Sequence, residues 1–455
     1  MNVRSSDKTR IFEQMPVPGA LAKMAIPTII SQLIILLYNM ADTWFIGRTN
    51  DPYMVAASSL VLTVFMMTTA LANFFGVGGG TLAVRLLGSG QEAEARKVAK
   101  LSLILAATAA TAFSLLCAIF MEPLLRLLGA SEHTMGYAKQ YLTFVVVLGA
   151  LPAVLSNVMS AMLRNQGFSR EAAFGLSMGG LLNVALDPLL MFVLMPEGME
   201  VVGAALATLL SNCGALVYYI ASYSRVRHRS VLSLSGKLEK IRPESLRSMF
   251  SVGIPAAMSV LLFDVTNMVI NRLSASYGDF QLAAMGIVLK VERLPLNIGI
   301  GICLGMVPLV AYNYASRNYR RMGDFFSAAR LAGMCVAVVS VVLYYLGAPW
   351  LIRTFIREPI TAGYGIQFLR ARCFATPFMF LSFHMVHFMQ AIDRGKISFY
   401  LALIRQLCLN IPLLLLLNAL FGMTGIVWTQ MIADILNVLI SYWIYAHVLH
   451  RMPVD

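Results

Sequence analysis

Six polar side chains in the first half of this sequence lie in stretches that are otherwise almost entirely apolar. Asn39 and Asp42 are three residues apart, and this spacing places both on one face of a helix. The same holds for Asn183 and Asp187, which are four residues apart. If their helices pack together, two carboxylates, three amides and a hydroxyl form one oxygen-rich pocket. The six residues are Asn39, Asp42, Asn157, Asn183, Asp187 and Thr208.

An oxygen-rich pocket of this kind can bind a small cation. Na⁺ is a hard cation and takes carboxylate, amide and hydroxyl oxygens as ligands. A proton fits equally well, because two carboxylates in a low dielectric repel each other while both are ionised. Two other interpretations stay open. Asp187 precedes Pro188 and could cap a helix segment, and Asp42 could reach interfacial water from the outer end of its apolar run.

The composition places these residues in a membrane. Of the 455 residues, 58% are hydrophobic and 13% are charged, and the mean hydropathy is +0.74. A water-soluble domain carries about 25% charged residues, so this chain is a polytopic membrane protein. The first twenty residues lack the apolar core of a signal peptide, and we expect the first apolar run to stay in the membrane. The six cysteines show no Cys-x-x-Cys spacing and indicate neither a disulfide framework nor a zinc site.

Twelve apolar runs come close to or exceed the roughly 20 residues that a helix needs to cross a bilayer. Because only short connections separate the runs, we expect an all-α fold of twelve transmembrane helices. The runs cover residues 21–46, 54–84, 98–121, 138–163, 171–194, 202–223, 248–275, 281–312, 326–348, 366–391, 398–420 and 424–449.

The basic residues indicate how these helices are oriented. With both termini on one side, the segments of that side contain 25 of the 35 Lys and Arg residues, and the opposite side contains 6. Cytoplasmic loops are enriched in Lys and Arg, so we expect both termini in the cytoplasm. This distribution accounts for the net charge of +13 without a nucleic-acid partner. Segment 394–405, which includes Arg405, is one of those assigned to the cytoplasmic side.

A weak internal repeat divides the chain into two halves. At an offset of about 228 residues, Pro27 matches Pro255 and Asn39 matches Asn267. Each half has an even number of runs, so the repeat is parallel, and two six-helix bundles related by a pseudo-two-fold axis are typical of alternating-access transporters. The predicted parts are a first bundle with the cation site, a polar cytoplasmic linker and a second bundle, covering residues 1–223, 224–247 and 248–455.

The two acids of the first half are not repeated in the second. At the same offset, Asp42 falls on Ile270 and Asp187 falls on Leu415, so we expect cation binding in the first half alone. The second half has other polar residues within its apolar runs, and these are candidates for contact with a substrate. The predicted substrate-binding residues are Asn39, Asp264, Asn267 and Glu292.

Further charged residues of the second half have two interpretations. Glu292 could meet a cationic substrate, or it could form a structural ion pair with a basic residue of another helix. Arg370 and Arg372 lie near the outer end of their run, and we expect both to extend towards interfacial water. His384 and His387 share a helix face and could titrate, although a packed or hydrogen-bonded role is favoured.

Three motifs carry a resemblance to a known family. The first run contains AIPT followed by YNMADTWFIG, RLLGSGQEAEARK follows the glycine-rich end of the second run, and the fifth run contains LNVALDP. With these motifs the chain resembles a bacterial multidrug and toxic compound extrusion (MATE) transporter over essentially all twelve runs. The resemblance implies export of bulky, often cationic and aromatic compounds in exchange for Na⁺ or H⁺. It also implies a cation site at Asp42, Asn183 and Asp187, where Na⁺ could bind, with Asn157 and Thr208 beside it.

Two alternative functions fit less well. A lipid-linked precursor flippase of a related fold would be expected to have a more cationic cavity for a pyrophosphate. An intramembrane aspartyl protease would also use two aspartates in helices, but neither Asp42 nor Asp187 follows a Gly-x-Gly motif. No phosphate-binding Gly-rich loop with a Lys and a hydroxyl occurs, so transport would be driven by an ion gradient or by a partner subunit. We expect a monomeric carrier coupled to H⁺ or Na⁺, without catalytic residues or a cofactor. Its expected location is the cytoplasmic (inner) membrane of a bacterium.

Overall fold

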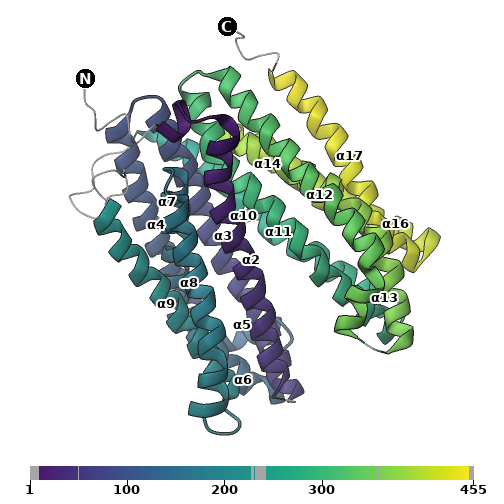
Figure 1. Cartoon of the computed structure of the whole chain (residues 1–455). Helices are drawn as coiled ribbons and strands as arrows, with labels where there is room; N and C mark the ends of the chain where they lie inside the picture. The colour runs from purple at the N-terminus through teal and green to yellow at the C-terminus, as the bar shows by residue number, and fades with distance from the viewer. Residues whose placement is uncertain (1–9, 50, 227–229, 231–241, 357, 450–455) are drawn as a thin grey trace. The chain divides into compact units, whose positions relative to one another are not determined.

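The computed structural model describes residues 10–49, 51–226, 230, 242–356 and 358–449 (Figure 1). Within these ranges every regular element is a helix. Most of the predicted linker, 224–247, lies outside the described residues.

The first half contains α2 (Val17–Gly47), α3 (Pro52–Gly88), α4 (Glu92–Ile119), α5 (Met121–Leu127), α6 (Glu132–Leu142), η1 (Thr143–Leu148), α7 (Ala150–Asn165), α8 (Ser169–Leu189), η2 (Leu190–Leu194) and α9 (Glu200–Val226). The second half contains α10 (Pro243–Ala275), α11 (Asp279–Ala315), α12 (Tyr319–Phe355), α13 (Pro359–Arg372), η3 (Cys373–Ala375), α14 (Thr376–Ala391), α15 (Gly395–Leu403), η4 (Ile404–Asn410), α16 (Ile411–Phe421) and α17 (Met423–Leu449).

The all-α membrane class is confirmed, and each predicted run coincides with helical structure. Ten helices of the described ranges are long and apolar enough to cross a membrane. An eleventh span is a bent pair, in which α6 with η1 meets α7 at 44°. The predicted run 366–391 corresponds to the end of α13, η3 and α14, each of which is short. Twelve apolar runs therefore give twelve helical passes, some of them broken.

The breaks are local changes of helix type. The segments η1, η2 and η4 are π-helical, and such segments often occur where a helix is adapted for function. η2 begins two residues after Pro188, which lacks an N–H and so cannot donate to the carbonyl four residues earlier. The start of α3, in contrast, is capped by a side chain. The Asp51 side chain accepts the Tyr53 N–H at 2.8 Å, directly before α3.

The helices form two compact units whose boundaries lie inside two helices. Unit 1 consists of residues 1–15 and 30–257, and unit 2 consists of residues 16–29 and 258–455. The first part of α2 therefore belongs to unit 2, and the first part of α10 belongs to unit 1. The boundaries after Ile29 and after Ala257 are 228 residues apart, the offset of the sequence repeat. The units differ from the predicted halves by these two exchanged segments.

Glycines allow each exchanged segment to pack closely within its unit. In unit 2, a Cβ atom added to Gly305 of α11 would lie 2.7 Å from Ala25 Cα of α2. In unit 1, a Cβ atom on Gly78 of α3 would lie 2.5 Å from the carbonyl oxygen of Met249 in α10. Real Cβ atoms do not come this close, so only glycine permits these helix approaches.

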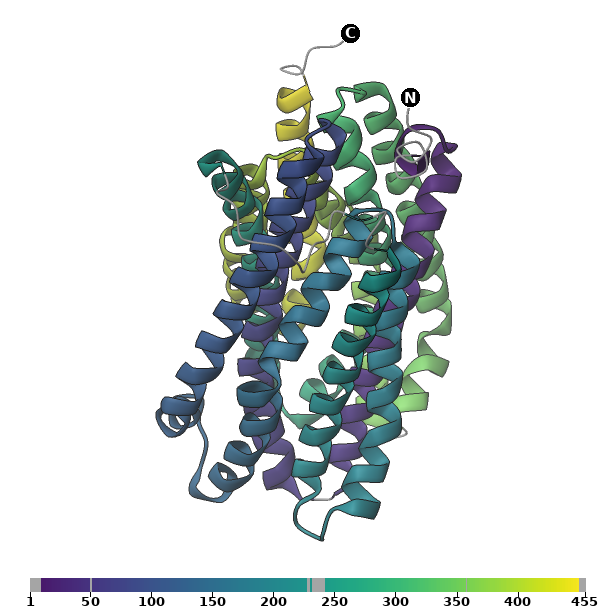
Figure 2. The ribbon, with the colours of Figure 1, turned by 90° about the vertical axis from the view of Figure 1, so that its left-hand side faces the viewer.

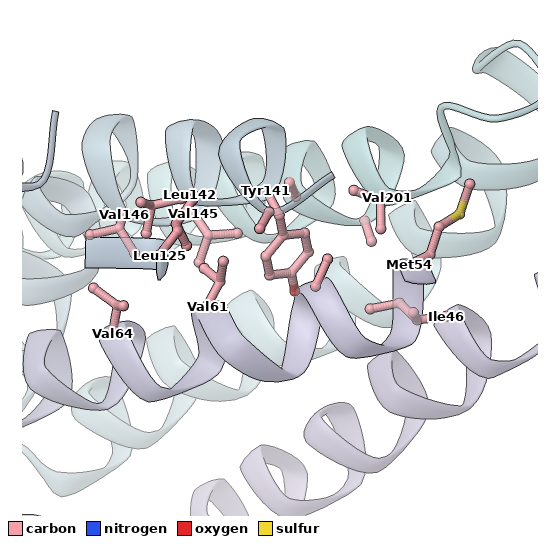
Figure 3. Close-up of a cluster of buried hydrophobic side chains, with 14 of the residues drawn as sticks. Ile46, Met54, Val61, Val64, Leu125, Tyr141, Leu142, Val145, Val146 and Val201 are labelled. Atoms are coloured by element: carbon pink, nitrogen blue, oxygen red, sulfur yellow. The ribbon is translucent and has the colours of Figure 1, made fainter. Parts of the chain in front are cut away.

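A cluster of buried side chains fixes the outer part of unit 1 (Figure 3). It joins α3 to α5, α6 and η1, and α9 contributes Val201. Tyr141 and Val145 of this cluster also line the cavity described below, so the cluster holds that wall in place. The residues labelled in Figure 3 are Ile46, Met54, Val61, Val64, Leu125, Tyr141, Leu142, Val145, Val146 and Val201.

Candidate functional site

The contact between α8 and α9 brings three of the predicted cation-site residues together. These two helices of unit 1 run side by side in both views (Figures 1 and 2). The Asn183 amide of α8 donates to Asp187 Oδ1 one turn later and to Thr208 Oγ1 of α9, each at a distance of 3.4 Å. The Thr208 hydroxyl in turn donates to the Ala204 carbonyl at 3.1 Å. Both hydrogen bonds that the Asn183 amide donates therefore go to protein side chains.

A cavity of about 80 Å³ lies between these residues and the other helices of unit 1. A water molecule needs roughly 10–15 Å³ by this measure, so the cavity has room for several. Asp42, Asn157, Asn183 and Thr208 line it, whereas Asp187 is fully buried and joins the site through its bond to Asn183. The other lining residues are Ile35, Tyr38, Asn39, Leu62, Phe65, Tyr141, Val145, Ser156, Leu176, Gly179, Gly180, Ser211, Asn212 and Ala215.

The two exposed amides of the site are anchored on their own helices. The Asn39 side chain donates to the Ile35 carbonyl at 2.8 Å, and the Asn157 side chain donates to the Ala153 carbonyl at 2.9 Å. Asn39 was predicted to bind substrate, and it lines the same cavity as the predicted cation-site residues.

Three oxygen atoms of the site are buried without a hydrogen-bond partner in the described part of the chain. They are Asp42 Oδ1, Asn183 Oδ1 and Asp187 Oδ2. An unpaired buried polar atom costs about 1–3 kcal/mol, and more when it is charged. No Lys or Arg is among the residues that line the cavity. The site is thus rich in unpaired oxygens and has no base of its own to neutralise them.

The two alternative interpretations of these acids fare differently. Asp187 does not end a helix, because α8 continues through Pro188 to Leu189 and Asp187 accepts from the Asn183 side chain. The capping interpretation is therefore wrong. Asp42 is half-buried, with one oxygen enclosed in the protein.

Glu292 of unit 2 forms the ion pair that was left open as an alternative. The Arg372 guanidinium donates to it through two bonds, Nε to Oε1 at 2.8 Å and Nη2 to Oε2 at 3.0 Å. Arg372 is buried, so the expectation that it extends to interfacial water is wrong. Arg370 donates to the Tyr345 carbonyl at 3.1 Å and lies over the Tyr345 ring. The two side chains pair because both are largely buried, and an isolated buried charge costs far more free energy than a paired one.

A second buried ion pair in unit 2 was missed by sequence reasoning. Arg405 of η4 donates to Asp434 of α17 through Nε at 2.6 Å and Nη2 at 3.3 Å. Gln430 also donates to Asp434, at 2.6 Å, and accepts from Asn410 at 3.1 Å. Arg405 is 4% exposed, so its assignment to a cytoplasmic segment is wrong. The overlooked pattern is a polar row in the last run at spacings of four, three and four residues, consisting of Gln430, Asp434, Asn437 and Ser441.

The remaining predicted residues of unit 2 are Asp264, Asn267, His384 and His387. Asn267 is half-buried in α10, and the Asp264 side chain lies outside the described residues. His384 is buried with Nε2 at 3.1 Å from the Phe326 carbonyl, and His387 Nδ1 is 2.8 Å from its helix carbonyl four residues earlier. Both histidines are hydrogen-bonded, as favoured. No group of three or more His, Cys, Asp or Glu side chains suited to a metal occurs among the residues described.

Comparison with known proteins identifies the family. A profile of the MatE family matches residues 27–189 and 255–416, two segments that begin 228 residues apart. The multidrug export protein MepA of Staphylococcus aureus strain MRSA252 is 30% identical over 444 residues, covering 98% of this chain and 97% of MepA. This chain belongs to the MATE family. MepA of Staphylococcus saprophyticus is likewise 30% identical, over 446 residues and the same shares of both chains.

Solved MATE structures have the same fold. A crystal structure of MATE in complex with MaD5 superposes with a TM-score of 0.89 at 24% identity, covering 97% of this chain and 99% of that one. An outward-facing multidrug resistance MATE transporter also gives 0.89, at 23% identity over 99% and 100% of the chains. The MATE family consists of transporters, so this protein is a multi-pass membrane transporter and not an enzyme.

Proposed function

We propose that this MATE protein is a secondary active antiporter that exports bulky, often cationic drug-like compounds in exchange for H⁺ or Na⁺. Its MepA relatives are multidrug export proteins. The observation that carries the coupling is that Asp42 and Asp187 each have one buried oxygen without a partner among the described residues, next to a cavity that no Lys or Arg lines. Intramembrane acids are costly, and a site that leaves them without a basic partner is suited to an exchangeable cation.

Each residue of the site has a distinct part in this proposal. Asp42 supplies the negative charge at the cavity wall, and Asp187 supplies a second one behind Asn183. Asn183 and Thr208 offer neutral oxygens, and Asn157 faces the same cavity from α7. Na⁺ would use oxygens of several of these groups, whereas H⁺ would bind one carboxylate. Neither ion requires a cofactor or ATP.

Coupling follows if the cation binds two states of the transporter with different affinities. A ligand shifts a conformational equilibrium only through such a difference. Substrate and cation binding are then linked, and each changes the affinity for the other by the same factor. We propose Glu292, Asn267, Asp264 and Asn39 as substrate contacts. For Glu292 this requires a cationic compound to compete with Arg372 for the carboxylate.

Two further parts of the proposal concern location and state. The protein would sit in the cytoplasmic membrane of a bacterium with both termini inside, and it would work as a monomer. The alternative of a lipid-linked precursor flippase is disfavoured, since a pyrophosphate would need basic residues and the unit 1 cavity has none among its lining residues.

The test is dye uptake into everted vesicles, which corresponds to export from the cell, under separately imposed sodium and proton gradients. We expect one of the two gradients to drive transport by the wild type, and Asp42→Asn to transport under neither. Glu122→Gln is the matched control, because Glu122 is an exposed acid of α5 already bonded to Arg126 and Lys139. Gradient-driven efflux by Asp42→Asn at the wild-type rate would contradict the proposal.

A further inference from the structure

The tandem glycines Gly179 and Gly180 of α8 face two different helices of unit 1. A Cβ atom on Gly179 would lie 3.2 Å from Ala215 Cβ of α9. A Cβ atom on Gly180 would lie 3.0 Å from both Ile34 Cγ2 and Tyr38 Cδ1 of α2. Carbon atoms in contact prefer separations of about 3.5–4.0 Å. At both positions a Cβ atom would therefore push against the neighbouring helix, which would have to give by a few tenths of an ångström.

The contact at Gly180 lies one helical turn from the candidate cation site on both helices. Asp42 follows Tyr38 by four residues on α2, and Asn183 follows Gly180 by three residues on α8, so each pair shares a helix face. As first and fifth spans, α2 and α8 cross the membrane in the same direction. One turn outward from the contact thus leads to Asp42 on one helix and Asn183 on the other.

We propose that Gly180 is a positioning residue that sets the separation of Asp42 from Asn183 and Asp187, and thereby the affinity for the coupling cation. This inference rests on the proposed antiport function and adds a residue that bonds to no cation itself. Gly180 lines the cavity but has no side chain, so its contribution is the approach of α2 that it permits.

The expected effect of a methyl group at position 180 follows from these distances. Ile34 and Tyr38 would have to retreat by several tenths of an ångström, and α2 would carry Asp42 with it. Metal–ligand distances are fixed to within about 0.2 Å, so a displacement of this size weakens a shared ion. Changes that misplace ligands without removing them cost about 10–100-fold in affinity.

The experiment compares Gly180→Ala with Gly136→Ala in reconstituted vesicles. Gly136 of α6 is a matched control because no heavy atom lies within 4 Å of a Cβ built there. Initial efflux rates are measured while sodium is titrated at fixed pH and while pH is titrated at fixed sodium. We expect Gly180→Ala to raise the half-saturating concentration of the coupling cation about 10-fold, and Gly136→Ala to leave it unchanged. An unchanged half-saturating concentration would overturn the proposal.

A second variant tests the steric path from position 180 to α2. Ile34→Ala removes the Cγ2 atom that the new methyl group would meet, and Ile34 does not line the cavity. In Gly180→Ala/Ile34→Ala we expect at least half of the shift, on a logarithmic scale, to be recovered. If the half-saturating concentration is raised equally in the single and the double variant, the effect does not pass through Ile34 and α2, and the proposal is contradicted.

A binding readout separates failure of this inference from failure of the antiport proposal. Dicyclohexylcarbodiimide modifies protonated buried carboxyl groups, and sodium protects a carboxylate that it occupies. Labelling of Asp42 in the purified protein is followed by mass spectrometry as sodium or pH is varied. If wild-type labelling responds to a cation and the Gly180→Ala midpoint shifts, the inference holds. If wild type responds and Gly180→Ala is identical to it, the inference is wrong while the cation site stands.

Discussion

The two units treat their intramembrane acids in opposite ways. In unit 2, Glu292 and Asp434 each accept two hydrogen bonds from a buried arginine. In unit 1, Asp42 and Asp187 each keep a buried oxygen without a partner among the described residues, and no Lys or Arg is among the residues that line the adjacent cavity. A paired acid is already neutralised by its arginine, whereas an unpaired one needs a cation from solution. The difference supports the proposal that coupling lies in unit 1, while each of these acids of unit 2 already has an arginine partner.

The largest expected effect is the loss of coupling when an acid of unit 1 is replaced. Asp42→Asn and Asp187→Asn remove a negative charge that no arginine balances, so we expect gradient-driven efflux to fall at least about 100-fold, which corresponds to about 2.7 kcal/mol. Folding should be retained, because a neutral amide costs less to bury than an unpaired carboxylate. Efflux assays with thermal unfolding of the purified variants measure both. Full activity in Asp187→Asn would remove that residue from the site.

In unit 2, the corresponding change should affect stability and not coupling. Arg405→Met leaves Asp434 as an uncompensated buried charge, and breaking a buried pair in this way costs about 3–5 kcal/mol. Arg405→Met/Asp434→Leu, which removes both charges, should restore most of the loss. Thermal unfolding in detergent gives the two values. A single variant as stable as the wild type would mean that Asp434 is neutralised by another route.

A smaller effect is expected when the charge of Glu292 alone is removed. Glu292→Gln keeps the shape of the side chain but leaves Arg372 with a neutral partner. We expect export of cationic compounds to fall several-fold, within the roughly 5–150-fold range typical of a coupling between sites, and that of neutral compounds to change less. Paired efflux measurements with a cationic and a neutral dye are the test. Equal losses for both dyes would favour a purely structural role.

The smallest effect concerns an acid of unit 2 that lies outside the spans. Hydrogen bonds from the Thr361 side chain and from the backbone N–H groups of Thr361 and Ile360 lower the pKa of Glu358, the N-cap of α13. The folded state thus favours the carboxylate, and this stabilisation is complete above the unfolded pKa of about 4.3. It is lost as pH falls through the lower folded pKa. As pH falls through this range, Tm should therefore fall further in the wild type than in Glu358→Gln, which lacks the carboxylate.

Sequence patterns predicted which polar residues lie together at the unit 1 cavity, because a carboxylate in an apolar run is conspicuous by itself. Asp42, Asn183 and Asp187 could be grouped by helical spacing, and the repeat showed that the second half lacks their equivalents. That Asp187 lies behind the cavity wall, joined through Asn183, depends on packing that no spacing reveals.

The ion pairs of unit 2 could not be predicted in the same way. Arg372 lies 80 residues from Glu292, and both had nearer charged neighbours in the sequence. Arg405 stood at the edge of an apolar run, where loop and helix cannot be separated by composition alone. Arg405 is buried because it pairs with Asp434 of α17, and Asn410 of η4 bonds to Gln430 of the same helix. The sequence does not indicate that these two helices face each other. The Gly180 contact likewise required the distance to Tyr38.

The most direct test of the account is a distance measurement between the two units as the cation is varied. Spin labels would be placed at Leu127 of α5 and Trp350 of α12, both highly exposed, after the exposed Cys335 and Cys408 are replaced. The account predicts that sodium or pH shifts the distance distribution in the wild type and in Glu292→Gln, and that Asp42→Asn abolishes the shift. A shift that survives in Asp42→Asn and disappears in Glu292→Gln would contradict it.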